Sequence, residues 1–264
     1  MKQLMMIGYG AMAQEIVKHL PQDLSLTWVV VPEDSVSKTQ TEVASTVKVI
    51  SSIDACDGQP DFVVEAAGQS AVIEHAEQIL SRGWKLGLIS VGALASDELY
   101  QRLSQAVQAH DSKLYLLSGA IAGIDGLAAA KLSGELTNVT YQAVKSPKSW
   151  LGSPAEQVLD LNNVQETTVF FKGTAREAAS TYKANSNVAA TIALAGLGLD
   201  ETMVELVVDP NIASNQHIVL VEGSFGQFKI EMNGKPLQSN PKTSALAALS
   251  VVRACHNYMN NIEI

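Results

Sequence analysis

The first residues of the chain constrain its fold more than any other segment. A short apolar run at residues 3–7 leads into the hexapeptide GYGAMA, and residues with helical spacing follow up to position 20. Gly8, Gly10 and Ala13 fit the pattern G-x-G-x-x-G/A, in which the first glycine permits a tight turn and the second lets a pyrophosphate approach the backbone. The small third residue lets the helix pack closely on the strand. This strand–turn–helix unit therefore predicts a dinucleotide-binding domain.

The first turn of the following helix extends this prediction to two further residues. Backbone amides at a helix N-terminus lack intrahelical partners and favour bound anions. We therefore expect Gly8, Gly10, Ala11 and Met12 to hold the pyrophosphate of the dinucleotide. The alternative is a structural turn in another α/β fold, because the glycine pattern alone is weakly specific.

Apolar strands and helical patterns alternate through the first 118 residues. The expected strands are residues 3–7, 26–31, 61–65, 86–91 and 114–117, and the expected helices are 12–20, 70–82 and 97–110. Unbroken apolar strands that alternate with helices indicate a parallel sheet covered on both faces. The predicted class is α/β, with a doubly wound sheet of the Rossmann type.

The pattern changes after Ser118. Strand-like runs at residues 137–144, 166–172, 203–208, 218–222 and 227–232 indicate a second, α+β domain with a mostly antiparallel sheet. Helices are expected at residues 120–132, 186–197 and 243–260, and the apolar last helix should pack back on the first domain. We predict a dinucleotide-binding domain of residues 1–118 with 241–264. Residues 119–240 then form a domain for substrate binding, catalysis and oligomerisation.

Composition argues against several classes of protein. The net charge of −9 argues against a nucleic-acid or anionic-membrane partner. No stretch approaches about 18 uninterrupted apolar residues, so we expect no transmembrane helix, and the N-terminus is interpreted as a strand and not as a signal peptide. The two cysteines, Cys56 and Cys255, argue against a disulfide framework and suggest a cytoplasmic protein. No metal-ligand spacing is present, and we expect no metal.

An acidic pair follows the second expected strand. In dinucleotide-binding domains a carboxylate at this place accepts hydrogen bonds from the ribose of the adenosine. Glu33 or Asp34 suits this role, and a carboxylate there would repel a 2′-phosphate, which favours NAD while leaving NADP possible. A solvated turn is the alternative, because Pro32 displaces the acids from the usual position. Glu65, at the end of another strand, is expected to cap the turn at Gly68.

One of the five histidines stands apart from the others. His217 follows a turn at residues 209–211 and precedes the expected strand 218–222, and such loop–strand junctions often carry catalytic residues. An imidazole has an ordinary pKa of about 6.5 and can serve as a general acid or base. A structural histidine is the alternative on these grounds alone.

Several residues could bind an acidic substrate. Lys242 and Thr243 stand at the expected start of the last helix, where a side chain and a helix N-terminus could hold a carboxylate together. Ser90 lies at the end of a parallel strand, on the edge where open α/β sheets bind ligands. Lys145, Lys148, Lys172 and Arg176 are further candidates, although each is also compatible with a solvated surface charge.

An ordered set of motifs resembles the L-aspartate dehydrogenase family over essentially the whole chain. The matching pieces are VEAAG at 64–68, SVGAL at 90–94, SGAIAGID at 118–125, NSNVAA at 185–190, DP at 209–210 with NQH at 215–217, and NPKTS at 240–244. The resemblance implies a catalytic role for His217 and contacts of Ala120 and Asn187 with the nicotinamide half of the cofactor. Asn185, Ser186 and Asn187 are also good helix N-cap residues.

The resemblance also implies an activity. It implies NAD(P)-dependent oxidative deamination of L-aspartate through iminoaspartate to oxaloacetate and ammonia, the reverse amination, a link to NAD biosynthesis, and a homodimer. Alternatives are another two-domain reductase, such as a dihydrodipicolinate reductase-like or homoserine dehydrogenase-like enzyme, and a dinucleotide sensor without turnover. Substrate preference and turnover would discriminate among these three.

Overall fold

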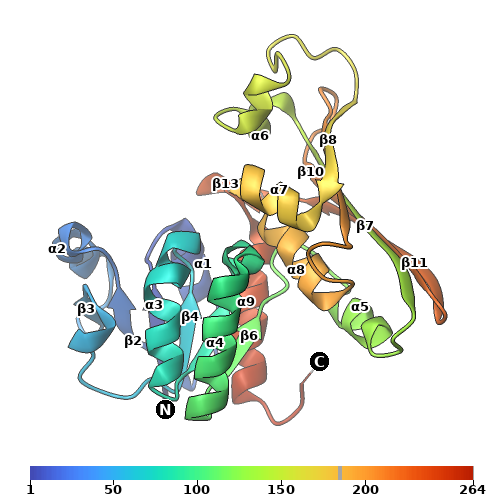
Figure 1. The fold of residues 1–264 in the computed structure, drawn as a ribbon. Coiled ribbons are helices and arrows are strands. Elements are labelled where there is room, and N and C mark those ends of the chain that lie inside the picture. Colours follow the sequence, from blue (N-terminus) through green and yellow to red (C-terminus); the bar gives the residue numbers. More distant parts are fainter. Residues whose placement is uncertain (184–185, 264) are drawn as a thin grey trace. The chain divides into compact units, whose positions relative to one another are not determined.

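The structure is a computed structural model that describes residues 1–183 and 186–263, with the side chains of all of these except Pro241 and Lys242. It divides into two compact units, each described by itself (Figure 1). Unit 1 comprises Met1–Leu117 with Ala247–Ile264, and unit 2 comprises Ser118–Leu246. The sequence had placed the corresponding boundaries after residues 118 and 240.

Unit 1 is built on a six-stranded sheet. Its elements are β1 (Lys2–Ile7), α1 (Ala11–Val17), β2 (Leu24–Val30), α2 (Glu33–Glu42), β3 (Lys48–Ile50), the 3-10 helix η1 (Ile53–Ala55), β4 (Phe62–Glu65), α3 (Gln69–Ser81), β5 (Lys85–Leu88), the 3-10 helix η2 (Val91–Ala95), α4 (Asp97–His110), β6 (Lys113–Leu116) and α9 (Ala245–Met259). The strand order is β3-β2-β1-β4-β5-β6 and every pair is parallel. This is the Rossmann order, so the expected parallel sheet is confirmed.

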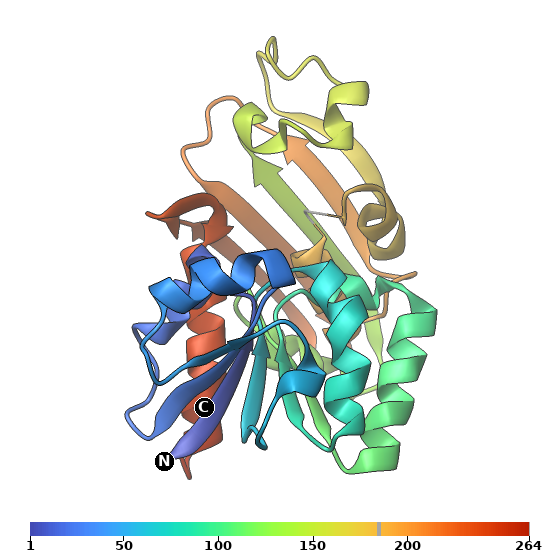
Figure 2. The same ribbon diagram turned by 90° about the vertical axis from the view of Figure 1, so that its left-hand side faces the viewer.

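The core of unit 1 joins segments from both ends of the chain. Leu4 and Met6 of β1 pack in one cluster with Ile16 of α1 and with Val251 and Cys255 of α9. Helices α1 and α9 therefore cover one face of the sheet, while α3 packs over β4 and β5 on the other, together with α4 (Figure 2). The expectation that the last helix packs on the first domain is confirmed.

Unit 2 is built on a five-stranded sheet with a small hairpin beside it. Its elements are α5 (Ile124–Lys131), β7 (Leu136–Lys145), α6 (Pro147–Trp150), the 3-10 helix η3 (Pro154–Gln157), β8 (Thr168–Thr174), α7 (Ala175–Thr181), α8 (Asn187–Ala195), β9 (Met203–Val208), β10 (Asn215–Gly223), β11 (Gly226–Gly234), β12 (Pro236–Leu237) and β13 (Asn240–Ser244). The order of the large sheet is β11-β10-β7-β9-β8, and the pairs are antiparallel except for β7 with β9. The sheet is therefore mixed and mostly antiparallel.

One face of this sheet forms the core of unit 2. Along β7, Val139, Tyr141 and Ala143 are buried and the residues between them are only partly so. Helices α7 and α8 pack against β9 and β7, and α5 packs against α8. We call the helix-covered face of the sheet, which carries the side chains of Tyr141 and Ala143, the inner face.

Two expected helices begin later than the sequence suggested. The helix expected at residues 120–132 begins at Ile124, because Gly119 and Gly123 have φ angles of +67° and +71°, which an α-helix does not contain. The helix expected at residues 243–260 begins at Ala245, because Asn240–Ser244 pairs with β12 as a strand. Within the described part of the chain, no helix has both the length and the apolar character needed to cross a membrane.

Candidate active site

The glycine turn after β1 has the geometry that its sequence predicts. Gly8 has a φ of +87°, and a Cβ on it would lie 2.7 Å from the Cβ of Ala67, so a side chain is excluded by both conformation and space. Its N–H donates to the carbonyl of Val30 at 2.7 Å. A Cβ on Gly10, in contrast, would meet no atom within 4 Å. Open space therefore lies in front of Gly10, where α1 begins at Ala11 without a side-chain cap.

A buried carboxylate holds the loop behind this turn. Glu65 ends β4 and is 2% exposed. Its Oε1 accepts hydrogen bonds from the N–H groups of Ala67 at 2.8 Å and Gly68 at 2.7 Å, which confirms the expected cap. Its Oε1 also accepts from the hydroxyl of Ser90 at 3.0 Å, and its Oε2 accepts from the N–H of Ser90 at 2.9 Å. Glu65 thus links the ends of β4 and β5 and fixes the loop against which Gly8 packs.

The predicted ribose and pyrophosphate ligands lie at one edge of the sheet. Glu33 is exposed and is the first residue of α2, three residues beyond the end of β2. Strand β2 pairs in parallel with β1, which ends at the glycine turn. Glu33 and Asp34 lie in the first turn of α2, and both side chains are exposed. The strand order reverses between β1 and β4, and parallel sheets of this kind bind ligands at the carboxyl ends of the strands on either side of such a reversal.

His217 lies inside a strand of unit 2, and not at the junction expected from the sequence. It is the third residue of β10, faces Ala143 of β7, and is 6% exposed. Its Nδ1 lies 2.7 Å from the hydroxyl oxygen of Tyr141, and the two rings stack with centroids 5.9 Å apart at 15°. Burial, and then the charge of Lys145, lower the pKa of His217 to about 4. The imidazole is therefore neutral at neutral pH.

Lys145 stands beside this histidine at the end of β7. Its ammonium group lies 4.7 Å from the ring centroid of Trp150, an arrangement that favours the cation. Burial lowers the pKa of Lys145 to about 8. The inner face thus carries two nitrogen bases: Lys145, whose pKa lies near working pH, and His217, which is neutral there.

The other cations considered from the sequence have different surroundings. Lys172 forms an ion pair with Glu205 at 2.8 Å, and Arg176 forms a bidentate ion pair with Asp200, with N–O distances of 2.5 and 2.8 Å. Lys148 is exposed on α6. Lys145 is therefore the cation of this set that lies next to the histidine.

The remaining predicted residues occupy other elements. Ala120 is half-buried in the turn between Gly119 and α5, and Asn187 is the half-buried first residue of α8. Asn185, part of the same motif, lies outside the described residues. Lys242 and Thr243 are on β13, so they do not stand at a helix N-terminus as expected. Thr243 is half-buried, and the side chain of Lys242 lies outside the described part.

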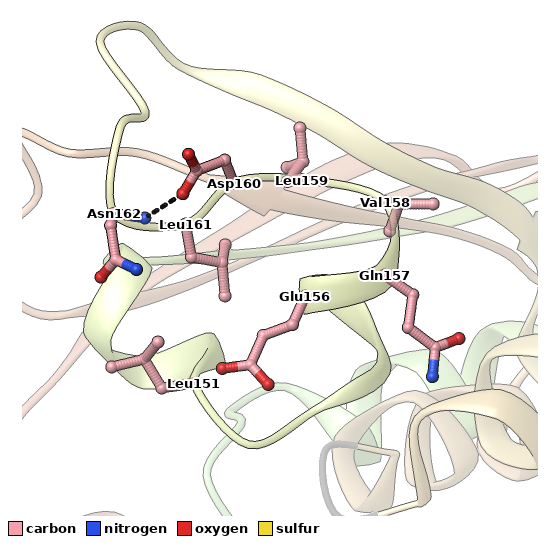
Figure 3. A pocket seen from close by; sticks show the side chains of 8 residues that line it. All are labelled: Leu151, Glu156, Gln157, Val158, Leu159, Asp160, Leu161 and Asn162. Carbon is pink, nitrogen blue, oxygen red and sulfur yellow. Dashed lines mark hydrogen bonds between the residues drawn. The ribbon is translucent and has the colours of Figure 1, made fainter.

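A separate surface hollow of about 480 Å³ lies in the segment after α6 (Figure 3). Its lining includes the carboxylates of Glu156 and Asp160 and no cation. Backbone amides of the same segment already bind both carboxylates, from Gly152 at 3.1 Å and from Asn162 at 3.2 Å. An anionic cofactor or dicarboxylate would be repelled there. Across residues 1–183 and 186–263, no cluster of three or more His, Cys, Asp or Glu side chains suits a metal ion.

Sequence reasoning missed Tyr141. The signal that could have identified it is the alternation of Tyr141, Ala143 and Lys145, which puts the three residues on one face of a strand. The missing information was the register of β7 with β10, since Tyr141 and His217 are 76 residues apart in the chain.

The fold and these two sites define a class of protein. A Rossmann-type unit with a glycine turn, followed by an α+β unit with a buried histidine, is the plan of a two-domain nicotinamide-dependent oxidoreductase. The NAD-binding domain family of homoserine dehydrogenase matches residues 8–117, and the aspartate dehydrogenase C-terminal family matches residues 125–258.

Whole-chain relatives narrow the class. The chain is 61% identical to an L-aspartate dehydrogenase of Acinetobacter baumannii over 264 residues, 100% of both chains. It is 52% identical to an L-aspartate dehydrogenase of Serratia proteamaculans over 260 residues, 98% of both chains. The chain belongs to the L-aspartate dehydrogenase family.

Solved structures agree with this assignment. The crystal structure of aspartate dehydrogenase from Thermotoga maritima matches with a TM-score of 0.78 and 25% identity, over 100% of this chain and 99% of that one. A dihydrodipicolinate reductase from a Paenisporosarcina species matches with a TM-score of 0.55 and 14% identity, over 98% and 95% of the two chains. The second likeness concerns the fold alone.

Proposed function

We propose that this protein is an NAD(P)-dependent L-aspartate dehydrogenase, which oxidises L-aspartate to iminoaspartate and catalyses the reverse amination. Water then converts iminoaspartate into oxaloacetate and ammonia. The observation that carries the proposal is the 61% identity, over the full length, to a protein of that name. The test measures NAD(P) reduction with L-aspartate, L-glutamate, L-alanine and L-homoserine, and NAD(P)H oxidation with oxaloacetate plus ammonia and with dihydrodipicolinate. Turnover of another substrate, with none of L-aspartate, would contradict it.

The residues of unit 1 fit a nicotinamide dinucleotide. The open space at Gly10 would admit a pyrophosphate close to the backbone, and the amides of Ala11 and Met12 stand at the start of α1. Bound there, the dinucleotide would accept the hydride from Cα of the substrate. Gly8 would hold the turn and Gly10 would leave the approach free.

Glu33 supports a preference for NAD over NADP. Its exposed carboxylate follows β2 at the sheet edge, where it could accept hydrogen bonds from ribose hydroxyls and repel a 2′-phosphate. We expect Glu33→Gln to lower the ratio of kcat/KM for NAD to that for NADP. Asp34→Asn is the matched control, because it removes the neighbouring charge at the same helix end. An equal effect of both substitutions would show that general charge, and not Glu33, sets the preference.

His217 is proposed as the general acid and base. A neutral imidazole can accept a proton from the water that adds to iminoaspartate, and the resulting imidazolium can return it to the departing amine. A pKa of about 4 keeps the free ring in its base form at working pH, and a negatively charged substrate bound beside it would raise that pKa. His217→Ala should lower kcat by about 10²- to 10⁴-fold while cofactor binding persists. Unchanged turnover in His217→Ala would refute the catalytic role. If the wild-type protein binds the cofactor but turns over no substrate, the dinucleotide sensor is favoured instead.

Lys145 is the cation best placed to bind a carboxylate of the substrate. An anion near its ammonium group would stabilise the charged form that burial now disfavours. Lys145→Met should therefore raise the KM for L-aspartate, whereas Lys148→Met, which removes an exposed lysine of α6, should not. Equal KM values in the two variants would argue against Lys145.

Roles for the remaining predicted residues are also proposals. Ala120 and Asn187 would contact the nicotinamide half of the cofactor, and Lys242 and Thr243 would contact substrate carboxylates. The hydroxyl of Ser90 already donates its proton to Glu65, so it would serve the substrate only as an acceptor from an amine. Alanine substitutions of the other four residues, and Ala120→Val, assayed for the KM of each ligand would test them.

The setting of the enzyme completes the proposal. We propose a cytoplasmic homodimer that supplies iminoaspartate for NAD biosynthesis. Two free cysteines support a reducing compartment. Light scattering of the purified protein tests the dimer, and a requirement for the protein during growth without external NAD precursors tests the pathway.

A further inference from the structure

The hydrogen bond between Tyr141 and His217 joins two side chains that the strand register brings together. In the antiparallel pair of β7 and β10, His217 faces Ala143 and Val219 faces Tyr141. Tyr141 and His217 are therefore diagonal neighbours on the inner face. The methyl group of Ala143 leaves room for both rings, which meet with their polar atoms 2.7 Å apart.

The surroundings of this pair hold little other charge. Strand β11 brings Phe228, Ile230 and Met232 to the same face of the sheet, since Met232 pairs with His217 and Ile230 with Val219. Helix α8, which packs on β7, carries no titratable side chain. On the inner face, Tyr141 and Lys145 of β7 are therefore the ionisable groups that flank the His217 ring among the described residues.

We propose that Tyr141 is a positioning residue that occupies Nδ1 of His217 and so leaves Nε2 as the nitrogen that exchanges the proton with the reacting molecule. This inference rests on the proposed catalytic role of His217. A buried Nδ1 without a partner would cost free energy, so the ring is held in the orientation in which Nδ1 meets the hydroxyl. A 180° flip of the ring would place the carbon Cδ2 against the hydroxyl in place of Nδ1, and this hydrogen bond would be lost.

The choice of a hydroxyl has a chemical consequence. A carboxylate beside Nδ1 would favour the imidazolium and raise the pKa of the histidine. A neutral ring whose Nε2 is free to accept a proton carries its own proton on Nδ1, so in this arrangement the hydroxyl oxygen of Tyr141 accepts from Nδ1–H. Burial raises the pKa of Tyr141, so its hydroxyl remains uncharged. Tyr141 therefore orients the ring without placing a negative charge beside it, which leaves His217 neutral and ready to accept a proton.

The test combines kinetics with nitrogen NMR of the histidine ring. In wild-type protein, long-range ¹H–¹⁵N spectra should show a single tautomer of His217, protonated on Nδ1, with its signals identified by their loss in His217→Gln; a ring protonated on Nε2 would contradict the proposal. Tyr141→Phe should give averaged nitrogen shifts of two tautomers and lower kcat by about 10- to 100-fold, with the KM for NAD unchanged. Tyr115→Phe is the matched control, because Tyr115 is a half-buried tyrosine of unit 1.

The outcomes separate this inference from the proposed function. Averaged tautomers in the wild type, or a kcat within twofold of wild type together with an unchanged tautomer in Tyr141→Phe, would overturn the positioning role. Absence of L-aspartate turnover in the wild type would overturn the function instead, because the NMR signature needs no substrate. The wild-type spectrum tests the inference even if Tyr141→Phe does not fold.

Discussion

Protonation of His217 should be a major cause of acid destabilisation in unit 2. Burial places its folded-state pKa at about 4, below the ordinary value of 6.5. The unfolded chain therefore takes up the proton first, and stability present above pH 6.5 is lost as the pH falls toward 4. At 1.36 kcal/mol per pKa unit, the loss across this window amounts to about 3 kcal/mol.

The measurement needs a probe confined to unit 2. The three tryptophans are Trp28 and Trp84 in unit 1 and Trp150 in unit 2. In a background with Trp28→Phe and Trp84→Phe, the fluorescence of Trp150 alone reports urea unfolding of unit 2. The unfolding free energy is then compared between this background and the same background with His217→Gln, at four pH values from 7.5 to about 4.5.

The difference between the two proteins isolates the histidine, since every carboxylate titrates in both. A glutamine keeps a hydrogen-bonding group near Tyr141 but takes up no proton. The parent should lose up to about 3 kcal/mol more than His217→Gln on acidification. Parallel pH profiles would refute the argument, because they would mean that the imidazole is as easily protonated in the folded protein as in the unfolded chain.

Other predictions concern unit 1. Gly8→Ala should destabilise the fold by about 1–3 kcal/mol, because of its positive φ and the collision of its Cβ with the loop after β4, and it should also abolish cofactor binding. Gly10→Ala should leave the melting temperature within a few degrees of wild type yet raise the KM for NAD strongly, because a Cβ at this position meets no protein atom within 4 Å. A large fall in melting temperature would contradict the open space in front of Gly10. Glu65→Ala should cost about 3–5 kcal/mol in thermal unfolding, since it leaves buried N–H groups without an acceptor, and a cost below about 1 kcal/mol would argue against this role. Native protein should react with a thiol reagent at Cys56 first, because Cys255 is buried and its pKa is raised to about 12. Equally fast labelling of both cysteines would show that Cys255 is not buried in solution.

Local features of the fold could be read from the sequence. The helix at Asp97–His110 and the strand at Met203–Val208 have the bounds expected, because an N-cap at Ser96 and an apolar run define them within a few residues. The glycine turn is also local, so its conformation was predictable. The helix start at Ile124 was not, because an alanine-rich segment hides the left-handed conformations of Gly119 and Gly123.

Contacts between distant segments could not be read in the same way. His217 could be selected as a candidate, but its position inside β10 and its partner Tyr141 depend on the register of β7 with β10. A shift of one residue would turn the histidine to the opposite face. The sequence predicts a helix cap for the segment that contains Lys242, but this segment forms strand β13. The pairing could not be predicted, because the partner strand β12 is only two residues long and gives little sequence signal.

The packing of α9 against β1 has a consequence for synthesis of the protein. Residues Leu4 and Met6 are synthesised long before Val251 and Cys255 of α9, which complete their core. The whole of Ser118–Leu246 is translated in between and has its own core. Unit 2 can therefore fold on the ribosome while unit 1 waits with an uncovered apolar face for the last helix. The domain that is encoded first is thus the last to reach its native state, and nascent chains arrested before α9 should be the ones that chaperones retain.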